Sequence, residues 1–91
     1  MRKTTIFTTS FEGGFHEWDS LDRWFAEQRN FDSAADCLDI LETLFREERT
    51  VAGGVEYRLV DPEEFAQQLA ALSARVVWEE GLDRSYLFAA A

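Results

Sequence analysis

Two residues have side chains suited to nucleophilic or proton-transfer chemistry, and each is the only one of its type. His16 would have to be the base of any Ser–His–Asp or Cys–His site, and Cys37 is the single thiol. Cys37 falls on the apolar stripe of a helical pattern, which favours a buried and unreactive thiol. We therefore predict that the protein has no catalytic residues and is not an enzyme.

Residue types that bind metals and phosphates are present, but their spacing fits no such site. Zinc needs several Cys or His ligands, and this chain has one of each. The acids from Glu17 to Asp22 lack the alternating ligands and central glycine of a calcium loop. The pairs Gly13–Gly14 and Gly53–Gly54 are turn signals, not phosphate-binding loops. We predict no cofactor-binding and no metal-binding residues. A magnesium or calcium site made only of carboxylates is the alternative that stays open.

The excess of acidic residues is the feature that bears most directly on function. Eighteen carboxylates face nine basic residues, which gives a net charge of −9. Nucleic acids and anionic membranes are bound through Lys and Arg, so we expect neither as a direct partner. A protein of this charge is attracted to a basic surface. The alternative is that the charge serves solubility alone.

Most of this excess lies between Glu17 and Glu48, in two segments predicted to be helical. A helix that buries an apolar stripe directs its charged residues outward. Acids three or four positions apart rise by about 4.5–6 Å along the helix axis. A row of them could imitate neighbouring phosphates and occupy the basic surface of a nucleic-acid-binding protein. The predicted partner-binding residues are Glu17, Trp18, Asp19, Asp22, Asp32, Asp36, Asp39 and Glu42.

Trp18 and Trp78 are the aromatic residues that fit the predicted core patterns least well. Exposed Trp side chains often anchor protein interfaces, and Trp18 is included among the partner-binding residues on that ground. The alternative is that both rings cap the ends of the core.

Apolar periodicity and turn residues predict the secondary structure. Thr, Ile and Phe alternate over residues 3–11 as in a strand, with Phe7, Thr9 and Phe11 on one face. Asp61 and Pro62 are the strongest helix-start signal, because Asp caps and Pro suits the first helical position. The predicted elements are strands 3–11 and 15–18, helices 20–29 and 33–48, strands 51–52 and 55–60, helix 62–80 and a terminal strand 86–88. A competing interpretation ends the last helix near Ala74 and makes residues 76–78 a strand.

This order of elements predicts a single α+β domain over residues 1–91, with about three helices on one face of a small antiparallel sheet. One cysteine permits no intramolecular disulfide, which fits a reducing compartment. The N-terminal residues lack the apolar region of a signal peptide, and no stretch is apolar enough to span a bilayer. We therefore expect a cytoplasmic protein.

Small size, excess acid and the lack of catalytic residues form a recognisable profile. Eight Arg against one Lys, with frequent Ala, indicate a GC-rich bacterial or phage genome. This profile is similar in kind to anti-CRISPR and anti-restriction inhibitors. The similarity implies an inhibitor or regulator, phage-encoded and acting in the host cytoplasm, whose partner has an Arg/Lys-rich surface and belongs to a nucleic-acid-binding effector complex. The alternatives are an accessory interaction subunit or a homodimer formed through apolar surface, and, third, a small enzyme.

Overall fold

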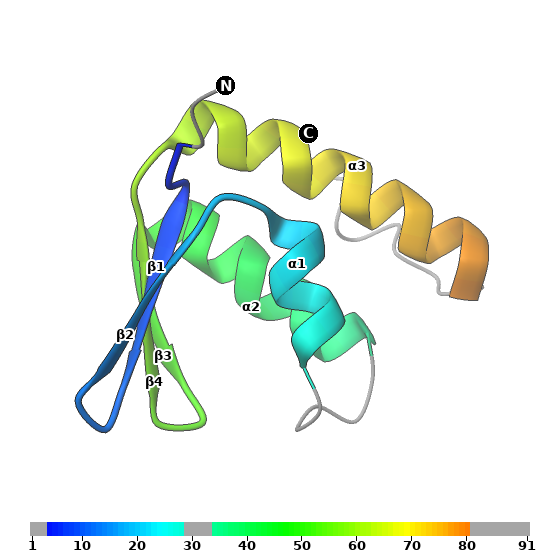
Figure 1. Ribbon diagram of the computed structural model, residues 1–91. Coiled ribbons are helices and arrows are strands. Elements are labelled where there is room, and N and C mark those ends of the chain that lie inside the picture. Colours follow the sequence, from blue (N-terminus) through cyan, green and yellow to red (C-terminus); the bar gives the residue numbers. More distant parts are fainter. Residues whose placement is uncertain (1–3, 29–33, 81–91) are drawn as a thin grey trace.

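The computed structural model describes residues 4–28 and 34–80, which form three helices and one four-stranded antiparallel sheet (Figure 1). The α+β class predicted from the sequence is confirmed. In chain order the elements are β1 (Phe7–Phe11), β2 (Gly14–Trp18), α1 (Leu21–Glu27), α2 (Ala34–Glu47), β3 (Arg49–Ala52), β4 (Val55–Leu59) and α3 (Pro62–Glu80). The predicted strand 86–88 lies outside the described residues.

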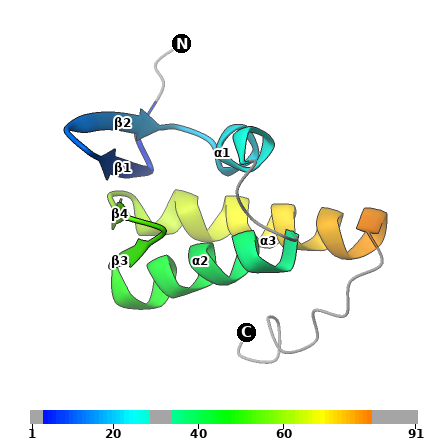
Figure 2. The same cartoon turned by 90° about the horizontal axis from the view of Figure 1, so that it is seen from below.

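The sheet consists of two hairpins placed side by side, in the order β2-β1-β4-β3. Phe7 lies opposite Trp18 of β2 and Leu59 of β4, and directly opposed residues of antiparallel strands share a face. This face, with Thr9 and Tyr57 on its next row, is the one that the helices cover. The helices all lie on one side of the sheet, so no described element covers the other side, the open face (Figures 1 and 2).

Both hairpins are closed by two-residue turns with positive φ. The φ angles are 46° and 85° at Glu12 and Gly13, and 60° and 81° at Gly53 and Gly54. Positive φ at both central residues is the mark of the type I′ turn, whose twist suits a hairpin. The first turn therefore lies one position earlier than the predicted Gly13–Gly14. At the second turn, a Cβ on Gly54 would come within 3.2 Å of the Phe11 ring, so a side chain there would disturb the packing between the hairpins.

Side-chain caps begin two of the helices. Ser20 Oγ accepts a hydrogen bond of 3.2 Å from the Arg23 amide at the start of α1, and Asp61 Oδ1 accepts one of 3.2 Å from the Glu64 amide at the start of α3. The helix α3 continues without interruption to Glu80, so the competing interpretation of residues 76–78 as a strand is wrong. The reason is that Val76, 2% exposed, continues the buried stripe of the helix.

The core is built largely from aromatic rings. Phe7 stacks on Trp18 with ring centroids 6.1 Å apart, and it meets Trp24 and Phe65 edge to face at 6.3 and 5.7 Å. Leu side chains of α2 and α3 pack beside these rings. On the predicted apolar stripe of α2, Cys37, Leu38, Leu41 and Leu44 are buried, whereas Phe45 at its end is 40% exposed. Because β1, α1 and α3 each contribute a ring, this cluster fixes the positions of α1 and α3 against the sheet.

Candidate acidic protein-binding surfaces

The predicted partner-binding acids fall into two groups on different parts of the molecule. Glu17 on β2, Asp19 before α1 and Asp22 in its first turn form the α1 flank. The α2 flank consists of Asp36, Asp39 and Glu42. Asp32 lies outside the described residues.

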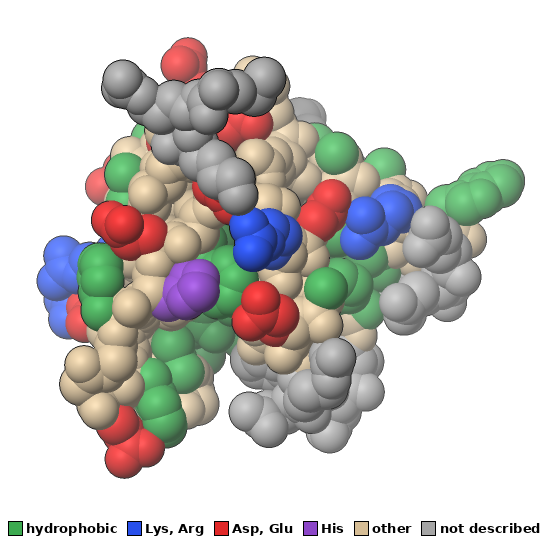
Figure 3. All heavy atoms as spheres, viewed as in Figure 1, with side chains coloured by type: hydrophobic (Ala, Val, Ile, Leu, Met, Phe, Trp, Pro, Cys, Tyr) green, Lys and Arg blue, Asp and Glu red, His purple; other side chains and the backbone are tan. Residues whose placement is uncertain are grey.

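The fold keeps these two flanks apart. The helix α1 contacts β2 at one edge of the sheet, while α2 contacts β3 and β4 at the other. The last helix, α3, packs against both and lies between them in Figure 2. The predicted acids therefore do not form one continuous row across the two middle helices. On the face shown in Figure 3, acidic side chains are dispersed among basic and uncharged ones.

Within each flank, exposure differs from residue to residue. Asp36 and Asp39 are exposed on the outer side of α2, as the helical pattern predicted, and Glu42 is half-buried. On the other flank, Glu17 and Asp22 are exposed and Asp19 is half-buried. Each flank thus has two exposed acidic residues.

The arginines of the described residues form ion pairs with carboxylates of the same chain. The Asp19 carboxylate lies 3.8 Å from the Arg23 guanidinium, and that of Glu42 lies 2.9 Å from Arg46. Both pairs have the i,i+4 spacing that favours ion pairs on a helix, a signal that the sequence contained and the sequence analysis did not use. The carboxylate of Asp22 pairs with Arg75 of α3 at 3.3 Å, a contact that the fold creates. Such exposed pairs each contribute about 0–1 kcal/mol to stability.

The remaining arginines of the described residues lie on the open face. Glu56 accepts a hydrogen bond of 2.5 Å from Nε of Arg49, and its carboxylate lies 3.3 Å from Nε of Arg58. The hydrogen bond from Arg49 is the largest effect and holds the pKa of the Glu56 carboxyl below its usual value. Desolvation opposes this lowering, and the charges of Arg49 and Arg58 add to it. Throughout residues 4–28 and 34–80, every arginine lies within 4.0 Å of a carboxylate.

The two candidate tryptophans have opposite environments. Trp18 is 7% exposed, and its Nε1 donates a hydrogen bond of 2.9 Å to Thr9 Oγ1. The use of Trp18 as an exposed anchor is therefore wrong, because its ring completes the core beside Phe7. Trp78, near the end of α3, is 87% exposed and does not cap the core among the described residues. Of the residues three and four positions before it on the helix, Arg75 is charged and Ala74 is small, and both are exposed.

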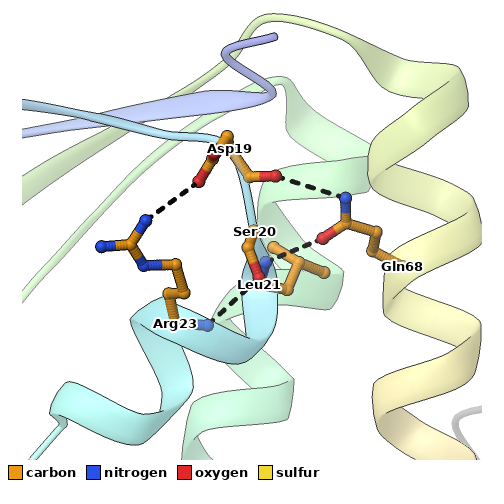
Figure 4. A network of polar contacts seen from close by, with 5 residues as sticks. All are labelled: Asp19, Ser20, Leu21, Arg23 and Gln68. Atoms are coloured by element: carbon orange, nitrogen blue, oxygen red, sulfur yellow. Dashed lines mark hydrogen bonds and ion pairs between the residues drawn. The ribbon is translucent and has the colours of Figure 1, made fainter. Parts of the chain in front are cut away.

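A glutamine that the sequence analysis missed connects α1 to α3. Gln68 accepts a hydrogen bond of 2.9 Å from the Leu21 amide through Oε1, and its Nε2 donates to the Asp19 carbonyl at 3.4 Å (Figure 4). The same Nε2 donates to Glu64 at 3.0 Å. Together with the Ser20 cap, these bonds satisfy amides at the first turn of α1, which have no partner inside the helix. The acids of the α1 flank are thereby held on a fixed part of the backbone.

The potentially reactive side chains lie on separate elements. His16 is exposed on β2, with its ring 4.0 Å from that of Trp18. Cys37 is buried on α2, near the buried Tyr57. Burial raises the pKa of the Tyr57 hydroxyl; Cys37 adds to this rise, and a hydrogen bond with Trp24 opposes it. A half-open hollow of about 350 Å³ between α1 and α3 is lined by Ser20, Asp22, Gln68, Ala71 and Arg75.

Comparisons with other proteins do not add to this picture. No protein-family model, curated protein or solved structure matches the chain. Among the described residues, no group of three or more His, Cys, Asp or Glu side chains is placed to hold a metal ion. No described helix combines the length and the apolar character that crossing a bilayer requires. The function must therefore be argued from surface charge and exposed groups.

Proposed function

We propose that this protein is a non-enzymatic inhibitor or regulator that binds a basic surface of a nucleic-acid-binding protein in the cytoplasm. The observation that carries the proposal is that each arginine of the described residues is paired with a carboxylate of the same chain. Since an internal ion pair leaves the net charge unchanged, the full excess of −9 remains to act on a partner.

The physical consequence is attraction that begins before contact. Opposite potentials speed the encounter of two proteins and orient them, and salt weakens this effect because the Debye length falls to about 8 Å at physiological ionic strength. Asp36 and Asp39 add a local feature, since both are exposed on the outer side of α2 and rise along its axis by about 4.5 Å. This arrangement supports imitation of neighbouring phosphates by a single helix, the α2 flank.

The test uses two double charge reversals that change the net charge equally on different flanks. One variant is Asp36→Lys with Asp39→Lys, and the other is Glu17→Lys with Asp22→Lys. A partner captured with the wild-type protein from its native host is measured against both variants by calorimetry at low and moderate salt. We expect wild-type binding to weaken steeply with salt, and one variant to lose about tenfold or more in affinity relative to the other.

The two variants are each other's control, because a non-specific effect of net charge would weaken both by the same factor. Equal loss, or wild-type affinity in both, would contradict the proposed electrostatic interface. Circular dichroism must first show that both variants keep the fold, since Asp22→Lys places a second cation near Arg75.

A second function is supported by the outer side of α3. Gln67, Ala70, Ala74 and Trp78 are exposed there and carry no charge, although Glu63 and Arg75 of the same helix are exposed and charged. The solvent side of a surface helix usually carries charged residues, and exposed Trp is typical of interfaces. This surface would suit an accessory interaction subunit or a homodimer. Light scattering after size exclusion tests the dimer: a dimer that Trp78→Ala converts to a monomer would support it, and a wild-type monomer at all concentrations would exclude it.

A further inference from the structure

We infer that the free edge of β2 is a docking strand for an extended basic segment of the partner. This inference rests on the proposed function and specifies which part of the molecule the partner contacts. Among the described strands, β2 is at the end of the sheet order, and residues 14–17 are all exposed. Natural edge strands are commonly protected by Lys or Pro, and β2 contains neither.

The hairpin register shows which backbone groups are available at this edge. Phe11 and Gly14 close the two-residue turn and so form a hydrogen-bonded pair, as does every second pair along the ladder. Gly14, His16 and Trp18 therefore direct their backbone groups toward β1. Phe15 and Glu17 direct their N–H and C=O groups away from β1, toward the open edge. An added strand would find two donors and two acceptors there.

The side chains beside these groups define the chemistry of the partner. Phe15 and Glu17 both project from the open face, because they lie opposite Ser10 and Thr8 in the register. Phe15 is 66% exposed, and Glu17 is also exposed. A segment paired with β2 would place apolar and basic side chains next to these two, since alternate residues of a strand share a face. The matching occupant is an extended segment in which an apolar residue and a Lys or Arg are two positions apart, so that both lie on the open face beside Phe15 and Glu17.

Charge distinguishes this edge from the opposite one. The other edge strand, β3, begins with Arg49, and Arg58 of β4 lies directly opposite it. A basic segment would meet two guanidinium groups there, partly compensated by Glu56. The edge at β2 has no Lys or Arg on the strand and is flanked by Glu12 and by Asp19, whose carboxylate is paired with Arg23. The sheet formed by residues 4–28 and 34–80 thus has two edge strands, and of these only β2 matches a cationic segment.

Proline substitutions test the edge without changing the charge. In Phe15→Pro the lost N–H is one that points outward, so the pairing of β1 with β2 is kept. The matched control is Val51→Pro on β3, which also lies at a position whose N–H points outward. Phe15→Val is a second control, because it removes the ring and keeps the donor.

The probes are a synthetic peptide that repeats Val-Thr-Lys-Thr, which places Val and Lys on one face, and the same peptide with every backbone amide N-methylated. The two have equal charge and differ in the ability to form a strand ladder. We expect the wild-type protein to bind the unmethylated peptide about tenfold more tightly at low salt, as judged by fluorescence anisotropy. Val51→Pro and Phe15→Val should keep this preference, and Phe15→Pro should lose it.

The outcomes separate this inference from the proposed function. Equal, salt-sensitive binding of both peptides would overturn strand docking and leave the proposed basic partner standing. A preference that Val51→Pro removes and Phe15→Pro keeps would overturn the assignment to β2. Binding of neither peptide at low salt would contradict both proposals. If Phe15→Pro does not fold, amide exchange in the wild-type protein decides: slowed exchange at Phe15 and Glu17 with the peptide supports docking, and unchanged exchange refutes it.

Discussion

Ser73 places a hydroxyl group inside the apolar core. The residue is fully buried on α3, and its Oγ has no hydrogen-bond partner among the described residues. Burial of an unsatisfied hydroxyl costs roughly 1–3 kcal/mol of folding free energy. Alanine at this position removes the polar atom and leaves a space smaller than one methyl group.

We therefore predict that Ser73→Ala raises the free energy of unfolding by about 1 kcal/mol. Urea denaturation at constant pH measures the change, and Ser10→Ala on the open face is the control for serine removal in general. A less stable Ser73→Ala variant would mean that the hydroxyl does have a partner and that the cost of its burial is met.

Single residues show what sequence patterns can and cannot give. Asp36 and Asp39 were placed outward by helical periodicity alone, and they are exposed. The two tryptophans were not separable in this way, because Trp18 lies at the end of a short strand and Trp78 at the end of a helix. What buries Trp18 is its stacking on Phe7 and its bond to Thr9, both of which depend on how β1 pairs with β2. Pairing register is not encoded in either residue.

At the scale of elements, Gln68 of α3 makes the side-chain hydrogen bonds that connect this helix to the start of α1. Its side chain satisfies the Leu21 amide and reaches the Asp19 carbonyl, so it joins α3 to the start of α1. Loss of the side chain leaves that amide without its partner and loosens the α1 flank.

We predict that Gln68→Ala lowers the free energy of unfolding by about 1–2 kcal/mol. The neighbouring Gln67→Ala variant is the control, because Gln67 is exposed on the same helix and the gain in helix propensity is the same. Urea denaturation of both variants measures the difference. Equal stability of the two would show that the Gln68 hydrogen bonds contribute nothing net.

The elements themselves were largely predictable, because their signals are local. Asp61 and Pro62 mark the start of α3, and the caps and stripes of the other helices lie within a few residues of each other. The first turn was placed one residue too late, since Glu12-Gly13 and Gly13-Gly14 can both close a hairpin. Both choices put Trp18 on the helix-covered face. The packing of Trp18 directly against Phe7 selects the earlier turn, and this contact is not local.

For the whole molecule, the net charge of −9 has a consequence for stability. Like charges repel one another more strongly in the compact state than in the unfolded chain, and salt screens this repulsion. We predict that Tm rises by a few degrees between low salt and about 0.5 M sodium chloride, which scanning calorimetry can measure. A neutral osmolyte at equal osmolality is the control. A falling Tm would show that the screened ion pairs outweigh the repulsion.

The separation of the acids into the α1 flank and the α2 flank could not be predicted, because it depends on the position of α3. The sequence places the acids of α1 and α2 close together along the chain, and this suggested a shared surface. In the structure α1 lies near β2, α2 lies near β3, and α3 packs against both. The position of α3 follows from contacts between residues far apart in sequence, such as Gln68 with Leu21 and Arg75 with Asp22.

The packing of α3 against both earlier helices also constrains how the chain acquires its shape during synthesis. A nascent chain that has emerged only as far as Asp61 has every strand of the described sheet, yet it lacks Phe65, Leu69, Leu72 and Val76. The apolar sides of α1 and α2 then face water, and such surfaces make partly folded chains prone to aggregation. We therefore expect chaperones to bind the nascent chain during translation until α3 has been synthesised and covers these surfaces.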